Sequence, residues 1–206
     1  MVRHLIALLA FALPLAAAEP SGTSLFDGTT FTGWEGNTTA IWRIEDGALV
    51  AGRMGLKQPE NDFLCTTREY GDFDLTLMYC NKRMNGGVQF RSQRVPKSHE
   101  MIGYQADFLK GGDGNLYDES RRRRNLAVPD AATVAKLALV EWNRLRIRAV
   151  GPHISLWVNG VQTVDYTEAD PAIPQRGFIG LQIHKNAQEI RYRDLVITEL
   201  PPGAAP

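Results

Sequence analysis

An apolar side chain at every second position is the pattern that most constrains how this chain can fold. In FDLTLMY, residues 73–79, four apolar side chains share one face, and in RLRIRAV, residues 144–150, apolar residues alternate with arginines. Successive side chains of a β-strand point to opposite faces of a sheet, so this spacing predicts half-buried strands. Asn159-Gly160, within HISLWVNGVQTVDY, is typical of a two-residue type I′ hairpin turn.

Helix signals are nearly absent. Only PDAATVAKLAL, residues 129–139, has a helical pattern, with Asp130 as a plausible cap and at most about two turns. Strands without long helices between them predict an all-β chain, a jelly-roll sandwich of two antiparallel sheets with at most one short helix. Because the composition is uniform from Leu25 to Leu200, we expect one domain over residues 19–200, followed by a disordered Pro-rich tail over residues 201–206.

The first 18 residues have the pattern of a secretory signal peptide. Arg3 precedes an apolar run from Leu5 to Ala17, and Ala16-Ala17-Ala18 is a small-residue cleavage site. The run is shorter than the roughly 20 apolar residues that span a bilayer, and no later stretch is long enough either. We therefore expect an exported protein, periplasmic or extracellular, with no membrane span.

The charge balance limits the kinds of binding partner that we expect. The chain has 23 Lys and Arg against 23 Asp and Glu, and loss of Arg3 with the signal peptide leaves the mature protein almost neutral. A neutral surface argues against nucleic acid or an anionic surface as the main partner.

The two cysteines, Cys65 and Cys80, are expected to be free, mostly buried thiols. A disulfide would be ordinary in an exported protein. However, the strands that carry the cysteines are joined at Tyr70-Gly71, and folding about that point places Cys65 opposite a residue near position 76. The remaining offset is over roughly 10 Å, more than a disulfide spans.

Three strand segments repeat one template, Gly-x-Gln-x-(Arg/Asp/His), at residues 87–91, 103–107 and 180–184. Residues two apart point to the same face of a strand. The template therefore predicts three same-face pairs: Gln89 with Arg91, Gln105 with Asp107, and Gln182 with His184. The opposite face is apolar, as a core-facing side requires, and carries Val88, Phe90, Tyr104, Ala106, Leu181 and Ile183.

The polar face of these strands has two interpretations. An antiparallel sheet often shows one polar face to water. Exposed strand positions usually carry Thr, Lys, Glu or Ser, however, whereas here glutamine recurs beside a different functional group each time. The glycine two residues before each glutamine leaves space for a ligand, and amides offer both a donor and an acceptor to sugar hydroxyls. We therefore expect a carbohydrate-like ligand on a concave sheet face.

Residues 111–129, GGDGNLYDESRRRRNLAVP, also have two interpretations. In one, the acids and arginines of a solvated loop pair with each other. In the other, the loop covers the open sheet face, where Tyr117 stacks on a sugar, Glu119 acts as acid or base, and one arginine binds a ligand oxygen. Neither H-E-x-x-H, C-x-x-C nor G-x-S-x-G occurs in the chain, so spacing supports no zinc site and no nucleophile elbow.

An ordered series of motifs makes the chain resemble the 3-keto-disaccharide hydrolase domain family. The motifs are LFDG (25–28), GW (33–34), Trp42, EDGALV (45–50), REYGDFDL (68–75), NGGVQFRS (85–92), GYQAD (103–107), LYDESRR (116–122), EWN (141–143), VNG (158–160) and GLQIH (180–184). They cover nearly the whole mature chain; YRDL (192–195) departs from the F-R-N often found in the family. The resemblance implies a concanavalin A-like jelly roll and cleavage of glycosides that carry a ketone at C3.

The implied chemistry assigns hypothetical roles. A C3 ketone acidifies the C2 hydrogen, so a base removes it, the C1 substituent is expelled, and water adds to the enone. His184 or Glu119 would be the base or acid, and Arg91 would stabilise the oxyanion. Asp107 would orient a partner. The substrate-binding residues would be Gln89, Gln105, Gln182, Tyr117 and Asp118. No cofactor is required, and a divalent cation on Asp107, Asp118 or Glu119 is the alternative to Arg91.

Two other functions compete with this one. A retaining glucanase needs two carboxylates about 5–5.5 Å apart, and no strand has the E-x-D pattern that would supply them. A non-catalytic carbohydrate-binding module is the stronger alternative, because sandwiches bind glycans without cutting them. The combination of His184 and Arg91 favours the enzyme, since binding alone needs no proton shuttle beside a cation.

Overall fold

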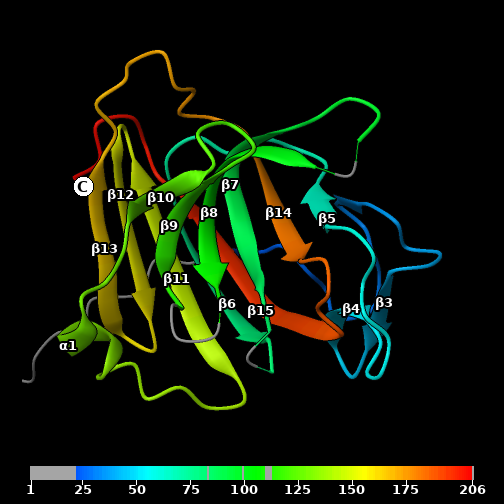
Figure 1. Cartoon of the computed structure of the whole chain (residues 1–206). Coiled ribbons are helices and arrows are strands. Elements are labelled where there is room, and N and C mark those ends of the chain that lie inside the picture. The colour runs from blue at the N-terminus through cyan, green and yellow to red at the C-terminus, as the bar shows by residue number, and fades with distance from the viewer. Residues whose placement is uncertain (1–21, 83, 99, 110–112, 206) are drawn as a thin grey trace, which may run out of the picture.

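The structure is a computed structural model that describes residues 22–82, 84–98, 100–109 and 113–205. The expected signal peptide, residues 1–18, lies outside the described residues. Two antiparallel sheets pack face to face, one in front of the other in Figure 1, and this confirms the predicted all-β sandwich. In the part of the chain that the structure describes, no helix is long and apolar enough to cross a membrane.

The rear sheet in Figure 1, called sheet A, comprises β1 (Thr23–Ser24), β3 (Trp42–Glu45), β4 (Ala48–Gly52), β6 (Phe73–Cys80), β11 (Asn143–Val150), β12 (His153–Val158), β13 (Val161–Thr167) and β15 (Glu189–Glu199). Its order is β13-β12-β11-β6-β15-β4-β3, with β1 paired to β15. Sheet B comprises β2 (Trp34–Glu35), β5 (Asp62–Thr66), β7 (Gly86–Arg94), β8 (Met101–Phe108), β9 (Asn115–Glu119), β10 (Arg124–Ala127) and β14 (Phe178–Ile183). Its order is β10-β9-β8-β7-β14-β5-β2.

The core lies between the two sheets and follows the predicted alternation. In β6, Phe73, Leu75, Leu77 and Tyr79 are at most 1% exposed, while the residues between them are partly exposed. Phe73 of sheet A meets Phe90 of sheet B edge to face, with ring centroids 6.2 Å apart, an arrangement that aromatic rings favour. The apolar face predicted for sheet B lies in the same core: Val88, Phe90, Tyr104, Ala106, Leu181 and Ile183.

The predicted turn and helix are both present in the structure, and the C-terminal tail has contacts of its own. Asn159 and Gly160 have φ of 50° and 83°, as the type I′ turn between β12 and β13 requires. The helix α1 is short, Ala131–Val134, and the Asp130 carboxylate caps it by accepting from the backbone N–H of Thr133 at 2.7 Å. Residues 201–205, expected to be disordered, form a turn, and Arg148 donates to the carbonyl of Ala205 at 2.6 Å.

The cysteines are free and buried, as predicted. The reason differs from the one given by the sequence, because the two strands do not pair as a hairpin. Cys65 lies in β5 of sheet B, opposite Gly180 of β14, whereas Cys80 ends β6 in sheet A. The segment around Tyr70-Gly71 therefore crosses from one sheet to the other.

Candidate functional site

The outer face of sheet B, directed away from the core, carries the three template glutamines. Gln89 of β7 lies opposite Gln105 of β8, while Gly180 lies opposite Gln89 and Gln182 opposite Gly87. Directly opposite residues of antiparallel strands share a face, so glutamines alternate with glycines across this part of the sheet. The structure thus brings the three amides together, as the strand periodicity predicted.

These side chains form a buried hydrogen-bond network. Ser92 Oγ donates to Gln89 Oε1 at 2.5 Å, and Gln89 Nε2 donates to Gln105 Oε1 at 3.1 Å. Gln105 Nε2 in turn donates to Asp107 Oδ1 at 2.7 Å and to Gln182 Oε1 at 3.0 Å. The glutamines are at most 2% exposed, and of the three only Gln105 lines the pocket described below. Gln89 and Gln182 therefore act on the pocket through their hydrogen bonds to Gln105.

The space beside the template glycines is filled by protein. A Cβ added at any of them would come within 3 Å of a neighbouring side chain: Gln105 at Gly87, Ser92 at Gly103 and Met101 at Gly180. The expectation that these glycines leave room for a ligand is therefore wrong. They allow neighbouring side chains to pack flat against the sheet.

Arg91 does not share a face with Gln89, contrary to the prediction. Its φ is 47°, and the pairing of β7 with β8 shifts register just after Phe90, so that two residues of β7 oppose one of β8. Such a β-bulge breaks the alternation of side chains. Ser92, whose hydroxyl contacts Gln89, takes the outer position instead.

The Arg91 guanidinium is part of the framework. Its side chain is 1% exposed and forms an ion pair with Asp72 Oδ1 at 2.7 Å. It also donates to the carbonyls of Gly71 at 3.0 Å and Gly151 at 2.5 Å. Since these contacts hold the guanidinium away from the pocket, the structure removes Arg91 from the predicted catalytic set.

Asp118 also lies away from the outer face. It pairs with Tyr104, a core residue, and its side chain is 0% exposed. Its carboxylate accepts from Arg121 Nε at 2.9 Å and from Arg122 Nε. Arg122 also pairs with Glu168, which follows β13, at 2.6 Å. Arg121 and Arg122 thus pair with acids, as one interpretation of residues 111–129 predicted, and Asp118 is removed from the substrate-binding set.

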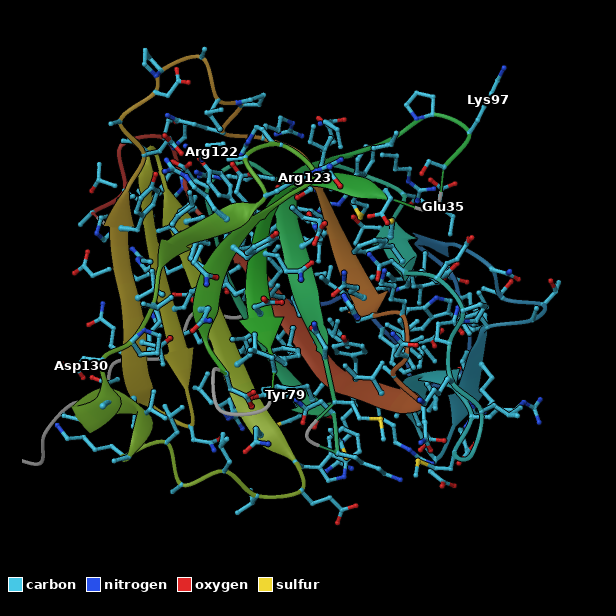
Figure 2. All side chains as sticks on the ribbon, in the orientation of Figure 1. Glu35, Tyr79, Lys97, Arg122, Arg123 and Asp130 are labelled. Atoms are coloured by element: carbon cyan, nitrogen blue, oxygen red, sulfur yellow. The ribbon has the colours of Figure 1, made fainter. Side chains whose placement is uncertain are left out.

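The arginine run lies at one end of the sandwich. Figure 2 shows Arg122 and Arg123 at that end, with Tyr79 toward the other. Arg123 and Arg124 are exposed. The run therefore forms most of the connection between β9 and β10.

The remaining predicted residues meet in a polar pocket of about 360 Å³. It lies over β8, β9 and the end of β14, and is lined by Asn61, Asn85, Gln105, Asp107, Leu109, Asn115, Tyr117, Glu119, Asn125 and His184. The four asparagines of this lining were not predicted from the sequence. Asn115 and Asn85 extend the period-two patterns of Tyr117 and Gly87, and that spacing was a usable signal.

Two carboxyl groups of this pocket have raised pKa values. Burial raises the pKa of Glu119 to about 7, and the nearby charges of Glu100 and Asp107 add to the effect. Burial likewise raises the pKa of Asp107 to about 6, against the hydrogen bond from Gln105 and with a contribution from Asp113. Carboxyl groups that titrate near neutral pH are suited to both giving and accepting a proton.

His184 is the third proton-active group of the pocket. Its Nδ1 lies 2.7 Å from the carbonyl oxygen of Lys185. A carbonyl only accepts, so Nδ1 carries the hydrogen in this contact, and Nε2 of the neutral ring carries the lone pair. The imidazole therefore offers the pocket a base.

The described residues contain no group of three His, Cys, Asp or Glu side chains arranged to hold a metal ion. Of the three carboxylates considered for a divalent cation, Asp107 and Glu119 line the pocket, whereas Asp118 is bound by arginines on the other face.

Several solved structures share the fold. A candidate glycosyl hydrolase from Parabacteroides distasonis is similar with a TM-score of 0.63 and 18% identity, covering 86% of this chain and 93% of that one. The carbohydrate-binding module CBM66 from Bacillus subtilis gives 0.60 and 13%, covering 81% and 96%. A Bacillus subtilis protein with a galectin-like fold gives 0.59 and 12%, covering 81% and 88%. At these identities the likeness establishes the jelly-roll fold alone. A search of curated proteins gave no match.

The family comparison is more informative. The profile described as "3-keto-alpha-glucoside-1,2-lyase-like domain" matches residues 21–198, which include nearly all of both sheets. This match confirms the family expected from the sequence motifs, and it supports a carbohydrate-related function. The chain belongs to the 3-keto-α-glucoside-1,2-lyase-like domain family.

Proposed function

We propose that this protein cleaves glycosides whose sugar carries a ketone at C3, by elimination across C1 and C2. A base takes the C2 proton, and the electron pair of that C–H bond passes into the enolate of the ketone. The enolate then forms the C1–C2 double bond as the C1–O bond breaks, and the departing oxygen takes a proton. Addition of water to the resulting enone yields the free 3-keto sugar.

The observation that carries the proposal is the meeting of three proton-active groups in one pocket. His184 follows β14, Glu119 ends β9, and Asp107 lies in β8, yet all three line the same polar cavity. The pKa values of Glu119 and Asp107 are raised to about 7 and about 6. Elimination needs one base and one acid that exchange protons near neutral pH, and this pocket supplies both.

The strand order supports a division of roles between His184 and Glu119. β9 and β14 are separated in sheet B by β8 and β7. Glu119 pairs with Gly103 of β8, whereas His184 follows Ile183, which is level with Phe108 at the other end of β8. The two side chains therefore approach a sugar in the pocket from opposite sides. In an α-glucoside the C2 hydrogen and the C1 oxygen are anti to each other. We assign His184 Nε2 as the base and Glu119 as the acid for the departing oxygen.

The pocket amides have a binding role in this proposal. With Arg91 held by Asp72, the donors for the enolate oxygen are the asparagine N–H groups of the pocket. Tyr117, half-buried at the pocket wall, offers a ring face to the sugar, and Gln105 holds Asp107 in place. Donors aimed at a developing oxyanion stabilise the transition state more than the ground state.

A non-catalytic sugar-binding module is the second candidate. It is favoured by the amide-rich pocket lining and by the fold likeness to CBM66. The test compares a 3-keto-α-glucoside with its unoxidised parent. Release of the aglycone from the keto sugar only, with solvent deuterium appearing at C2 of recovered substrate, supports the lyase. Binding of both sugars without release supports the module.

Export of the protein, expected from residues 1–18, also stays a proposal. Cell fractionation tests it, since an exported protein leaves the cytoplasmic fraction and begins near residue 19.

A further inference from the structure

Asn61, the residue before β5, links the turn after β14 to the residue that precedes β8. Its Oδ1 accepts from the backbone N–H of Lys185 at 3.0 Å, and its Nδ2 donates to Glu100 Oε1 at 3.1 Å. A backbone N–H only donates and a carboxylate only accepts, so the two partners together fix which way the amide of Asn61 faces. Glu100 lies just before β8, and Lys185 lies in the turn after β14.

The turn that Asn61 holds contains His184. The N–H of Ala187 donates to the carbonyl of His184 at 3.0 Å, which closes a four-residue turn. Asn186, at its third position, has φ of 69°, the pattern of a type II turn. The N–H of Asn186 donates to the carbonyl of Gln58 at 2.7 Å. The peptide after Lys185 is therefore fixed in orientation, and its carbonyl oxygen is presented to the imidazole.

The strand register places Asn61 and His184 side by side. Ile183 pairs with Asp62 of β5 and with Gly86 of β7, so the next residue, His184, lies between Asn61 and Asn85 at the end of the sheet. All three line the pocket. Asn61 holds the His184 turn by a hydrogen bond, whereas Asn85 Oδ1 has no hydrogen-bond partner among the described residues.

We propose that Asn61 is a positioning residue, which holds Lys185 so that its carbonyl keeps the hydrogen of His184 on Nδ1 and directs Nε2 into the pocket. Neutral histidine in water prefers the opposite tautomer, with its hydrogen on Nε2, so the fold must favour the Nδ1–H form through a specific contact. That contact is the 2.7 Å approach of Nδ1 to the Lys185 oxygen. The importance of this tautomer for catalysis rests on the proposed function, but the tautomer itself does not.

The test measures the tautomer of His184 by ¹⁵N NMR of the imidazole in the full mature chain. We expect the wild type to show hydrogen on Nδ1, and Asn61→Ala to show a mixture or the Nε2–H form. Asn85→Ala is the matched control, since it removes the other flanking asparagine without touching the turn, and it is expected to keep the Nδ1–H signal. Asn61→Asp combined with Glu100→Gln keeps an acceptor for the Lys185 N–H and gives the new carboxylate a donor in place of a second carboxylate, so this double variant should restore the wild-type tautomer.

The catalytic rates of the Asn61 variants provide a second test. Loss of a partner that orients a reacting imidazole typically costs roughly 10–100-fold, and we expect that loss in kcat for Asn61→Ala. The double variant should lose less, measured against Glu100→Gln alone. A wild-type His184 with hydrogen on Nε2, or an Asn61→Ala variant that keeps the Nδ1–H form, overturns the inference. If no 3-keto sugar is cleaved, the NMR result still decides the role of Asn61, and only the proposed function fails.

Discussion

The side chain of Gln105 lies flat over Gly87 of the neighbouring strand. A Cβ at Gly87 would be 2.8 Å from both Cγ and Cδ of Gln105, and 2.9 Å from the carbonyl oxygen of Ala106. The missing side chain at position 87 is what allows the Gln105 amide to reach Asp107 and Gln182. The form of the pocket floor therefore depends on a residue that does not line the pocket.

Gly87→Ala should destabilise the protein, because the new methyl group displaces Gln105 and meets backbone. Overpacking of this kind typically costs about 1–3 kcal/mol, and urea unfolding measures it. Gly71→Ala is the matched control, since the nearest atom to its Cβ is 3.7 Å away, at Arg176. It should stay within about 0.5 kcal/mol of wild type. Equal stability of the two variants would contradict the close contact.

Arg91→Met should unfold more easily than the wild type, because it leaves two backbone carbonyls without their donor and Asp72 with only the N–H of Gly151. Breaking a buried ion pair by removing one partner costs about 3–5 kcal/mol, again measured by urea unfolding. The control is Arg68→Met, which breaks the exposed pair with Glu199 and should cost about 1 kcal/mol or less. If Arg91→Met instead lowered kcat without changing the free energy of unfolding, Arg91 would have a catalytic role.

His184→Ala and Glu119→Gln should each lower kcat on a 3-keto-α-glucoside by at least about a hundredfold, because each removes a group that transfers a proton. The controls are His153→Ala and Glu141→Gln. His153 lies on β12 and pairs with Asp165, and Glu141 is exposed. Both should retain wild-type turnover. Near-normal rates in His184→Ala and Glu119→Gln would exclude the assigned roles.

The stability of the protein should depend on pH through Glu119. Its folded-state pKa of about 7 lies above its ordinary value of 4.5, so the folded state holds the proton more tightly than the unfolded state. This contribution is fully present below pH 4.5 and is lost as the pH rises through 7. Compared with Glu119→Gln, the wild type should thus become less stable between these values, as urea unfolding at several pH values will show. Parallel curves would count against a raised pKa.

The sequence predicted the side chains that obey simple alternation. Gln105 and Asp107 share the outer face as expected, and Glu119 joins them because β9 pairs in register with β8. Arg91 was misplaced because no sequence pattern indicates that its backbone adopts a left-handed conformation. The bulge depends on buried acceptors, distant in the sequence, that hold the guanidinium. Asp118 was misplaced because it was grouped with Tyr117 and Glu119, its neighbours in the chain, although adjacent strand residues face opposite ways.

The bulge at Arg91 shifts the phase of β7 by one residue. Beyond it, Gln93 pairs with Ile102 and Arg94 with Met101, so odd and even positions exchange their inward and outward directions. Met101 lies on the outer face in step with Gly103 and Gln105 of its own strand, β8, and there it covers Gly180 and contacts Cys65. Removing the extra residue would leave β7 and β8 with the same partners in a regular ladder, and no side chain at this point could then leave the alternation to reach Asp72 as Arg91 does. The length of the segment is therefore as constrained as its chemistry.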